Sequence, residues 1–185
     1  MRAFDFDGTI FAGDSTVRFC LFCIKRHPFL IKHLMKGVFA LIGYRRGRID
    51  KTQAKEKLFS FLAYLPDPEG EVAEFWRTNI RHLRKWYLKM CLPSGVIVSA
   101  SPEFLLRIPC EALGVHTLIA SRVDVKTGAY TGKNCDGGEK VARFREVFGK
   151  IRPEEFYSDS LSDAPMAEYA LRAYRVRGEK ISPWG

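Results

Sequence analysis

The sequence predicts an α/β fold in which a parallel sheet is interrupted by a long helical insert. Short apolar runs alternate with helical patterns from residue 95 onward, which is typical of parallel sheets with helices packed on them. Between the first apolar run and the next lie about 75 residues with helical patterns only, too many for an ordinary connection. We therefore expect a core formed by residues 1–11 and 91–185 and a helical cap subdomain formed by residues 12–90.

The N-terminal half contains one predicted strand and four predicted helices. The stretch "RAFDF" at residues 2–6 is predicted to be a short buried strand, and the turn-forming "DGT" ends it. Capping residues or prolines precede most of the helical patterns that follow. These patterns cover residues 17–26, 29–43 (closed by Gly43), 49–65 and 69–91.

The C-terminal half repeats the order of strand and helix. Strands are predicted at residues 95–101, 116–121, 154–160 and 174–178. Helices are predicted at residues 103–113, 137–149 and 162–173, and a hairpin at 122–132 turns at Thr127 and Gly128.

Two carboxylates stand at the end of the first strand. Asp5 and Asp7 are two residues apart, so on a strand their side chains point the same way. In open α/β sheets ligands bind beyond the carboxyl ends of the strands, so both carboxylates can face one crevice. Two buried like charges are costly unless a cation or a proton compensates them; a divalent metal would do so, and hard oxygen ligands suit magnesium. The pair therefore predicts a magnesium site.

Further polar residues follow the later strands. Ser99 lies at the end of the predicted strand "VIVS", and Asp159 and Asp163 follow the strand that contains "FYSDS". Lys140 lies in the first turn of a predicted helix. Carboxylates, a hydroxyl group and a lysine at one crevice are the groups that hold a phosphate beside a metal ion.

These stretches resemble the four motifs of the haloacid dehalogenase superfamily, in order and across nearly the whole chain. The four are "DFDGT", "VIVSAS", Lys140 within "GGEKVARF", and "YSDSLSD". The helical insert lies between the first two, as in the subgroup IB phosphatases that include phosphoserine phosphatase. The resemblance implies a Rossmann-like core with a C1-type helical cap. It also implies magnesium-dependent hydrolysis of a phosphomonoester through an aspartyl-phosphate.

The resemblance also implies a role for each site residue. Asp5 corresponds to the nucleophile, and Asp7 to the general acid and base whose backbone carbonyl contacts magnesium. Ser99 and Lys140 correspond to the phosphate-binding pair. Asp5, Asp7 and Asp159 are the implied metal ligands, with Asp163 as a supporting neighbour. An aspartate at position 7 distinguishes phosphatases from the dehalogenases and phosphonatases of the superfamily.

Three polar residues have more than one interpretation. Asp14 is either a helix cap or, as the resemblance implies, a contact to the substrate. Asp163 is either a helix cap or a supporting residue of the metal site. Ser101, next to Pro102, is either a helix cap or a ligand, and its position favours the cap.

The substrate is less defined than the chemistry. Residues 25–48 combine an apolar pattern with seven Lys or Arg side chains, and the whole chain carries a net charge of +9. This segment either packs against the core or lies on an anionic membrane surface. The layout resembles phosphatidylglycerophosphatase C relatives, which implies a lipid phosphate; the alternative is a small soluble substrate such as phosphoserine. No nucleic-acid-binding motif is present, so we expect no such partner.

The cysteines and the N-terminus predict a cytoplasmic protein, with possible contact to the inner face of the membrane. The first residues lead directly into the predicted strand, so no signal peptide is expected. The chain has an odd number of cysteines, five, and no second Cys or His pair that would complete a zinc site with Cys20 and Cys23. Reduced, buried cysteines are therefore expected.

Overall fold

The structure is a computed structural model that describes residues 1–90 and 95–185, and it confirms the predicted α/β fold. A six-stranded sheet with the order β3-β2-β1-β4-β5-β6 forms its centre. The first five strands in this order are parallel, and β6 pairs with β5 in the antiparallel sense. The strands are β1 (Arg2–Phe4), β2 (Val96–Pro102), β3 (Thr117–Ser121), β4 (Glu155–Ser158), β5 (Arg172–Arg177) and β6 (Lys180–Pro183).

Two apolar layers cover the two faces of the sheet. Alternate residues of a strand point to opposite faces, so Phe4 and Tyr157 join one apolar cluster while Ala3 and Phe156 join the other. The first cluster includes α6 (Glu103–Ala112), and the second includes α7 (Gly138–Phe148) and α8 (Ala164–Tyr169). Because β2, β1 and β4 are parallel neighbours, their carboxyl ends lie together at one edge of the sheet.

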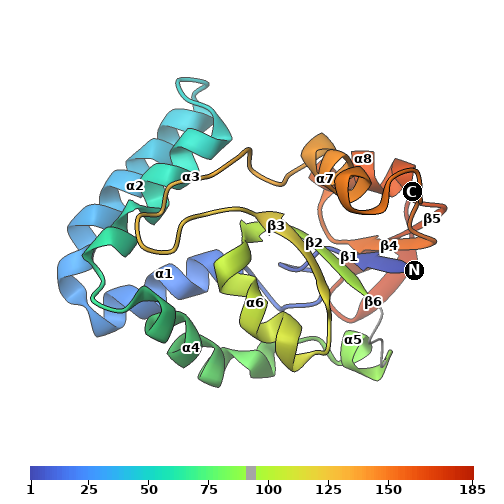
Figure 1. Cartoon of the computed structure of the whole chain (residues 1–185), viewed down its shortest axis with the longest axis horizontal. Helices are drawn as coiled ribbons and strands as arrows, with labels where there is room; N and C mark the ends of the chain where they lie inside the picture. The colour runs from blue at the N-terminus through green and yellow to red at the C-terminus, as the bar shows by residue number, and fades with distance from the viewer. Residues whose placement is uncertain (91–94) are drawn as a thin grey trace.

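Of the helices that lie between β1 and β2 in the sequence, we call four the cap helices: α1 (Ser15–Arg26), α2 (Ile31–Arg45), α3 (Lys51–Phe59) and α4 (Pro68–Asn79). Figure 1 shows α2 and α3 side by side, with α2 at the edge of the molecule furthest from the strands. A Cβ atom on Gly37 would lie 2.4 Å from Leu58 Cα, so this glycine lets α2 and α3 pack closely. The helix predicted to close at Gly43 continues to Arg45, and the chain turns at Gly47, whose φ is +69°.

The long helix predicted at residues 69–91 is wrong, because the chain leaves the helical conformation at Leu83. α4 ends at Asn79, a 3₁₀ turn (Ile80–His82) follows it up to Leu83, and the short helix α5 (Lys85–Lys89) comes next. The backbone N–H of Arg84 donates to the carbonyl of Ile10 at 2.8 Å, and that of Ala12 donates to the carbonyl of His82 at 2.9 Å. This backbone pairing with a distant segment outweighs the local helical preference.

The C-terminus forms a β-hairpin of which only one strand was predicted. The observed helix is shorter than the one predicted over 162–173, because α8 ends at Tyr169 and β5 begins at Arg172. The chain then turns at Gly178, whose φ is +64°, and returns as β6 with Tyr174 opposite Pro183. The polar, exposed sequence of β6 lacks the apolar alternation by which strands are recognised.

The predicted hairpin at residues 122–132 is a loop with a single β-bridge between Val123 and Tyr130. Its turn does fall at Thr127 and Gly128, as predicted, and the N–H of Gly128 donates to the carbonyl of Asp124 at 2.8 Å. The loop lies against α3, since a Cβ atom on Gly128 would lie 2.2 Å from the carbonyl oxygen of Phe59. This loop therefore forms a contact between the core and the cap helices.

The division into residues 1–11 with 91–185 and residues 12–90 remains a prediction. The second boundary of this division falls at residue 91, which lies outside the described residues. The same holds for the end of the helix predicted at 69–91 and for Cys91. Just before them, the rings of Trp86 and Tyr87 lie 6.3 and 5.0 Å from that of Phe4, so α5 packs beside β1.

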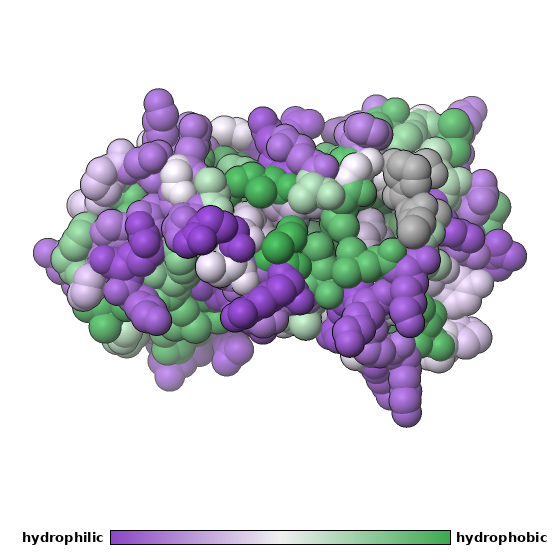
Figure 2. All heavy atoms as spheres, turned by 90° about the horizontal axis from the view of Figure 1, so that it is seen from below, coloured by the Kyte–Doolittle hydropathy of each residue, from purple (hydrophilic) through white to green (hydrophobic). Residues whose placement is uncertain are grey.

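Seen from below, the surface is mostly hydrophilic, with a band of apolar side chains across its middle (Figure 2).

Candidate active site

One pocket of about 490 Å³ lies at the carboxyl edge of the sheet, and it contains every site residue predicted from the sequence. Its core side is formed by the segments that follow β1, β2 and β4, together with the start of α7. Its opposite side is formed by residues of α1, α2 and α3. The predicted residues that line it are Asp5, Asp7, Asp14, Ser99, Lys140, Asp159 and Asp163.

A buried ion-pair cluster lies at the base of the pocket. The Nζ atom of Lys140 donates to Oδ1 of Asp5 at 2.7 Å and to Oδ2 of Asp163 at 2.8 Å. Burial alone would lower the pKa of Lys140, but these two carboxylates outweigh it and raise the pKa, so the ammonium group stays protonated. Ser158 donates to the same Oδ2 of Asp163 at 2.7 Å, which fixes that carboxylate under the lysine.

Asp5 is held between two opposing electrostatic effects. Burial raises the pKa of its carboxyl to about 7, and the neighbouring carboxylates Asp163 and Asp7 act in the same direction. The Lys140 ammonium opposes this increase through its charge and its hydrogen bond. A second positive charge at this point would favour the ionised carboxylate further.

The carboxyl group of Asp7 lies at the start of α1, where the chain enters the cap helices. Its Oδ1 accepts the backbone N–H of Ser15 at 2.6 Å, and its Oδ2 accepts a hydrogen bond from the hydroxyl of Ser101. Burial raises the pKa of Asp7 to about 6, Asp14 adds to the increase, and these two hydrogen bonds oppose it. A carboxyl with a pKa near neutrality can both donate and accept a proton.

Asp159 is brought to Asp5 by a residue that the sequence analysis missed. The hydroxyl of Thr9 lies 3.2 Å from Asp5 Oδ2 and 3.2 Å from Asp159 Oδ1, and it accepts the backbone N–H of Asp159 at 3.0 Å. The close approach needs Gly8, because a Cβ atom there would lie 2.1 Å from Asp159 Oδ2. Burial also raises the pKa of Asp159. The sequence signal that could have identified Thr9 as a site residue is the "GT" that directly follows Asp7.

The donor set fits a hard divalent cation. Within residues 1–90 and 95–185, no three His, Cys, Asp or Glu side chains converge where they could hold a metal ion. Two carboxylates do meet across Thr9, and burial disfavours the charged form of each. Two side-chain oxygens, with backbone carbonyl and water oxygens completing the shell, suit magnesium, which usually keeps several waters.

Ser101 is the site residue that the sequence analysis interpreted wrongly. It was expected to cap a helix, but Pro102 occupies the N-cap position of α6, which has no side-chain cap. The Ser101 hydroxyl instead contacts Asp7 and lies 3.2 Å from the Thr16 hydroxyl. Its backbone N–H donates to Ser99 Oγ at 3.1 Å, which orients the predicted phosphate-binding hydroxyl.

Asp14 and Asp163 were each interpreted as either a helix cap or a site residue, and the structure places them differently. Asp14 is the N-cap of α1, and its Oδ1 accepts the N–H of Val17 at 2.9 Å, while the residue also lines the pocket. Asp163 occupies the N-cap position of α8 without a side-chain cap bond, because its carboxylate is bound to Lys140 and Ser158. Its contacts are those of a supporting residue.

The cap helix α3 contributes two lysines that the sequence analysis did not single out. Lys55 Nζ donates to the carbonyl of Ala100 at 2.8 Å and to Asn134 Oδ1 at 2.9 Å, and Lys51 pairs with the carboxylate of Asp136. Burial lowers the pKa of Lys55 to about 8, and the charge of Lys51 adds to this decrease. The spacing of four places both lysines on one helix face, but their partners follow from tertiary contact alone.

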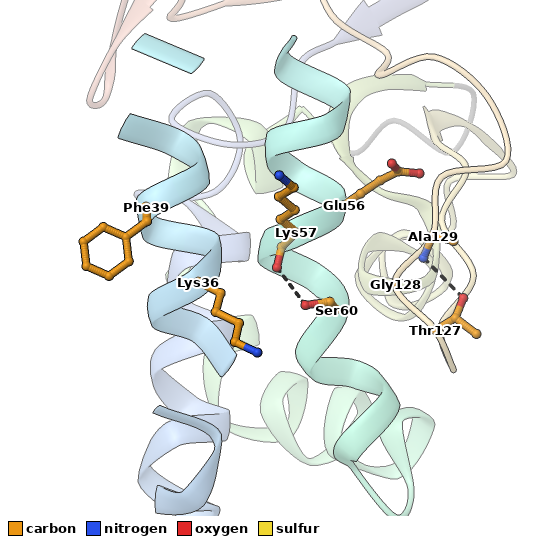
Figure 3. A pocket seen from close by; sticks show the side chains of 8 residues that line it. All are labelled: Lys36, Phe39, Glu56, Lys57, Ser60, Thr127, Gly128 and Ala129. Carbon is orange, nitrogen blue, oxygen red and sulfur yellow. Dashed lines mark hydrogen bonds between the residues drawn. The ribbon is translucent and has the colours of Figure 1, made fainter. Parts of the chain in front are cut away.

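A second, more open hollow of about 670 Å³ lies between α2, α3 and the turn at residues 127–129 (Figure 3). It contains none of the predicted site residues, and the side chains of Glu56, Ser60 and Thr127 that line it are bound to neighbouring backbone groups. We therefore place the chemistry in the pocket at the edge of the sheet.

The four described cysteines are free and buried, as expected: Cys20, Cys23, Cys110 and Cys135. Burial raises the pKa of each thiol, so these side chains are poor nucleophiles and are part of the apolar core. None of the helices in the described part of the chain is both long and apolar enough to cross a bilayer.

The paired carboxylates and the buried lysine thus lie at the carboxyl edge of a parallel sheet. The chain belongs to the haloacid dehalogenase-like hydrolase family, whose profile matches residues 3–168. The predicted family and the prediction of an enzyme are thereby confirmed.

Two proteins of known sequence are similar to this chain. Protein CicA of Caulobacter vibrioides is 30% identical over 190 residues, which cover 94% of this chain and 85% of that protein. A protein of Mycobacterium tuberculosis named probable phosphatase is 35% identical over 99 residues, which cover 50% of this chain and 34% of its own length.

Solved structures share the fold. A Bordetella pertussis protein of unknown function superposes with a TM-score of 0.79 at 25% identity, covering 94% of this chain and 87% of that one. A substrate-bound phosphoserine phosphatase gives a TM-score of 0.61 at 18% identity, with 93% and 83% covered. The latter likeness concerns the fold alone.

Proposed function

We propose that this chain is a magnesium-dependent phosphomonoester hydrolase that works through an aspartyl-phosphate on Asp5. One observation carries the proposal. Asp5 lies 2.7 Å from a buried, protonated Lys140, in the same pocket as a second carboxyl, Asp7, whose pKa is about 6. The pocket thus offers a nucleophile, a cation for the transferred group and a proton donor.

In the first step an ionised Asp5 oxygen attacks the phosphorus atom, and the bond from phosphorus to the alcohol oxygen breaks. Asp7 in its protonated form gives its proton to the departing alkoxide, so the alcohol leaves neutral. Lys140 keeps Asp5 in place and opposes the negative charge of the phosphate, and Ser99 donates a hydrogen bond to it. The enzyme then carries the phosphoryl group on Asp5.

In the second step a water molecule attacks the phosphorus of the aspartyl-phosphate. Asp7, now a carboxylate, takes one proton from this water, and the bond from Asp5 oxygen to phosphorus breaks. Inorganic phosphate leaves, Asp5 is again a carboxylate and Asp7 is again protonated. Ser101 and the Ser15 N–H hold the Asp7 carboxyl in one orientation through both proton transfers.

Magnesium bound by Asp5, Asp159 and the backbone carbonyl of Asp7 would supply positive charge to the phosphate during both steps. Asp163 supports this site by holding Lys140, and it is not proposed as a ligand.

The substrate we propose is a lipid phosphomonoester, such as phosphatidylglycerophosphate. Three apolar residues of the cap helices, Val17, Leu41 and Leu58, line the same pocket as the catalytic carboxylates. Lys51 and Lys55 add positive charge to that side, which favours a substrate with a further anionic group. We also propose that the protein acts at the cytoplasmic side of the membrane.

A small soluble phosphomonoester such as phosphoserine is the second candidate. The fold likeness to solved phosphoserine phosphatases and the position of Asp14 in the pocket favour it. A nucleic-acid-binding role has no comparable support.

The proposal is tested by hydrolysis of an aryl phosphate with magnesium, with and without EDTA. Asp5→Asn should abolish turnover, because the amide cannot form the acyl-phosphate by the same attack. Asp124→Asn, in the exposed 122–132 loop, is the matched control and should remain active. Full activity of folded Asp5→Asn protein would overturn the assignment of the nucleophile. Turnover of phosphatidylglycerophosphate and phosphoserine by the wild type then separates the two substrate classes.

A further inference from the structure

The outer face of α2 has an unusual distribution of apolar residues. Ile31, Met35, Val38, Phe39 and Ile42 follow one another at helical spacing, and each is between 39% and 64% exposed. The opposite face of the helix is buried and consists of Leu34, Gly37 and Ala40. The larger apolar side chains of this helix are thus mostly on the side that faces solvent. We call these five exposed residues the α2 stripe.

The packing of α2 fixes which way the stripe points. At Gly37 a Cβ atom would lie 2.4 Å from the backbone of Leu58, so the buried face of α2 is pressed against α3. In Figure 3 the ring of Phe39 points away from α3, and Figure 1 places α2 at the outer edge of the cap helices. The described part of the chain therefore leaves the stripe uncovered.

The charged residues of the sequence segment that contains the stripe have a single sign. The sequence has no Asp or Glu between residues 15 and 49, whereas it has eight Lys or Arg there. Lys32 and Lys36 flank the stripe, and Arg45, Arg46 and Arg48 surround the C-terminal end of the helix. These five side chains are exposed, and none forms an ion pair with another residue in the described ranges.

We propose that the α2 stripe is a docking surface for an anionic lipid bilayer. The five apolar side chains would enter the boundary between headgroups and acyl chains, and the basic side chains would contact anionic headgroups. An apolar face beside exposed basic side chains that form no ion pair is complementary to such a bilayer. A docked α2 would also present its inner side, where Leu41 lines the catalytic pocket, close to the membrane. The proposal concerns where the protein acts, and it does not depend on the proposed substrate.

The test is co-sedimentation with vesicles of pure phosphatidylcholine or of phosphatidylcholine with about one-third phosphatidylglycerol. Wild type should bind the anionic vesicles, bind the neutral ones weakly, and dissociate as salt screens the charges. Ile31→Ser with Phe39→Ser should lower the partition coefficient at least about tenfold, since two large apolar side chains no longer enter the bilayer. Lys32→Gln with Lys36→Gln should reduce binding to anionic vesicles only.

The matched control is Ile151→Ser with Leu171→Ser. It removes two apolar side chains that are 57% and 61% exposed and lie outside the cap helices. This variant should bind like the wild type. Equal binding by the stripe and control variants, or no binding by the wild type, would overturn the proposal. A dimer by light scattering that becomes a monomer in the stripe variant, without vesicle binding, would assign the stripe to self-association instead. Aryl phosphate hydrolysis should be unchanged in the stripe variant, so failure of docking and failure of the proposed chemistry are distinguishable.

Discussion

The core and the cap helices use their charged residues in opposite ways. In the core pocket Lys140 is 1% exposed and contacts two carboxylates, so its charge acts on groups within the protein. On α2, Lys32 and Lys36 are exposed and have no carboxylate within their segment of the sequence. A buried, paired charge defines the chemistry of a site, whereas an exposed, unpaired charge is available to whatever approaches from outside.

Lys51 and Lys55 stand between these two cases. They belong to a cap helix, yet their partners Asp136, Asn134 and Ala100 belong to the core. The comparison therefore predicts a graded series of effects, in which substitutions in the core pocket abolish chemistry and substitutions on α2 leave it intact.

The largest effect is expected at Lys140. In Lys140→Met the carboxylates of Asp5 and Asp163 lose their shared cation, so the free energy of unfolding should fall by about 3–5 kcal/mol. Turnover of an aryl phosphate should fall at least about 10²-fold, as for loss of one charge-stabilising group. Lys150→Met, at an exposed lysine just after α7, should change neither quantity. If Lys140→Met and Lys150→Met behaved alike in urea unfolding and in activity assays, the contrast between the buried, paired lysine and the exposed lysine would be refuted.

The next effect distinguishes the two aspartates that follow β4. Asp159→Ala removes one of the carboxylates that meet across Thr9, so the magnesium concentration for half-maximal activity should rise. Asp163→Ala removes a partner of Lys140 and should lower thermal stability, with less effect on the magnesium dependence. The measurement is a magnesium titration of both variants. If Asp163→Ala raised the magnesium requirement more than Asp159→Ala did, the assignment of the metal ligand would be wrong by one helical turn.

A smaller effect, on pH dependence, is expected at Ser101. Its hydrogen bond lowers the pKa of Asp7 from what burial alone would give, so Ser101→Ala should raise that pKa above about 6. Since the protonated form of Asp7 is needed by the leaving alkoxide, the decline of kcat on the alkaline side should move to higher pH. The shift should appear with an alkyl phosphate and be weaker with an aryl phosphate, whose leaving group needs less protonation. An unchanged profile would show that Asp7 is not the acid.

Lys55→Met tests the residues between the two regions. KM should rise by about three- to tenfold, because the variant loses positive charge at the pocket and two contacts between α3 and the core. The folded pKa of Lys55 is about 8, below its usual 10.5, so the unfolded chain binds more protons between these values. Wild-type stability should accordingly gain from this residue as pH rises through that window, and Lys55→Met should lack the gain. Lys57→Met, exposed on the same helix, is the control.

The smallest effect is expected on the outer face of α2. Phe39→Ser should change the free energy of unfolding by no more than about 0.5 kcal/mol, since the side chain is 64% exposed. Activity on a soluble aryl phosphate should also stay at the wild-type level. A large loss of stability in chemical denaturation would mean that the stripe is covered within the protein, and the contrast between the two regions would disappear.

The residues that the sequence analysis found share a common property: they lie next to the ends of recognisable strands. Asp5, Asp7, Ser99 and Asp159 follow apolar runs, so the sheet alone places them at one edge. Ser101 was misassigned, because its contact with Asp7 joins segments more than ninety residues apart. Lys55 was missed for a similar reason, since the carbonyl of Ala100 and the amide of Asn134 meet it only in the folded chain.

The fold was predictable to a similar extent. Periodicity predicted the parallel strands and the helical insert, because both depend on which residues are buried. It did not predict the interruption at Leu83, which comes from backbone hydrogen bonds to residues 10–12, nor the strand β6, whose residues are exposed. Local sequence carries little information about either feature.

The pairing of residues 10–12 with residues 82–84 has a mechanical consequence. The chain leaves the core and returns to it along two neighbouring segments, joined by backbone hydrogen bonds of 2.8 and 2.9 Å and by the Arg84 guanidinium on the carbonyl of Gly8. Because the two crossings are bonded to each other, neither segment can leave its position without breaking backbone hydrogen bonds to the other. The cap helices are also held to the core elsewhere, by the core partners of Lys51 and Lys55 and by the 2.6 Å hydrogen bond from the Trp76 indole to the carbonyl of Leu105.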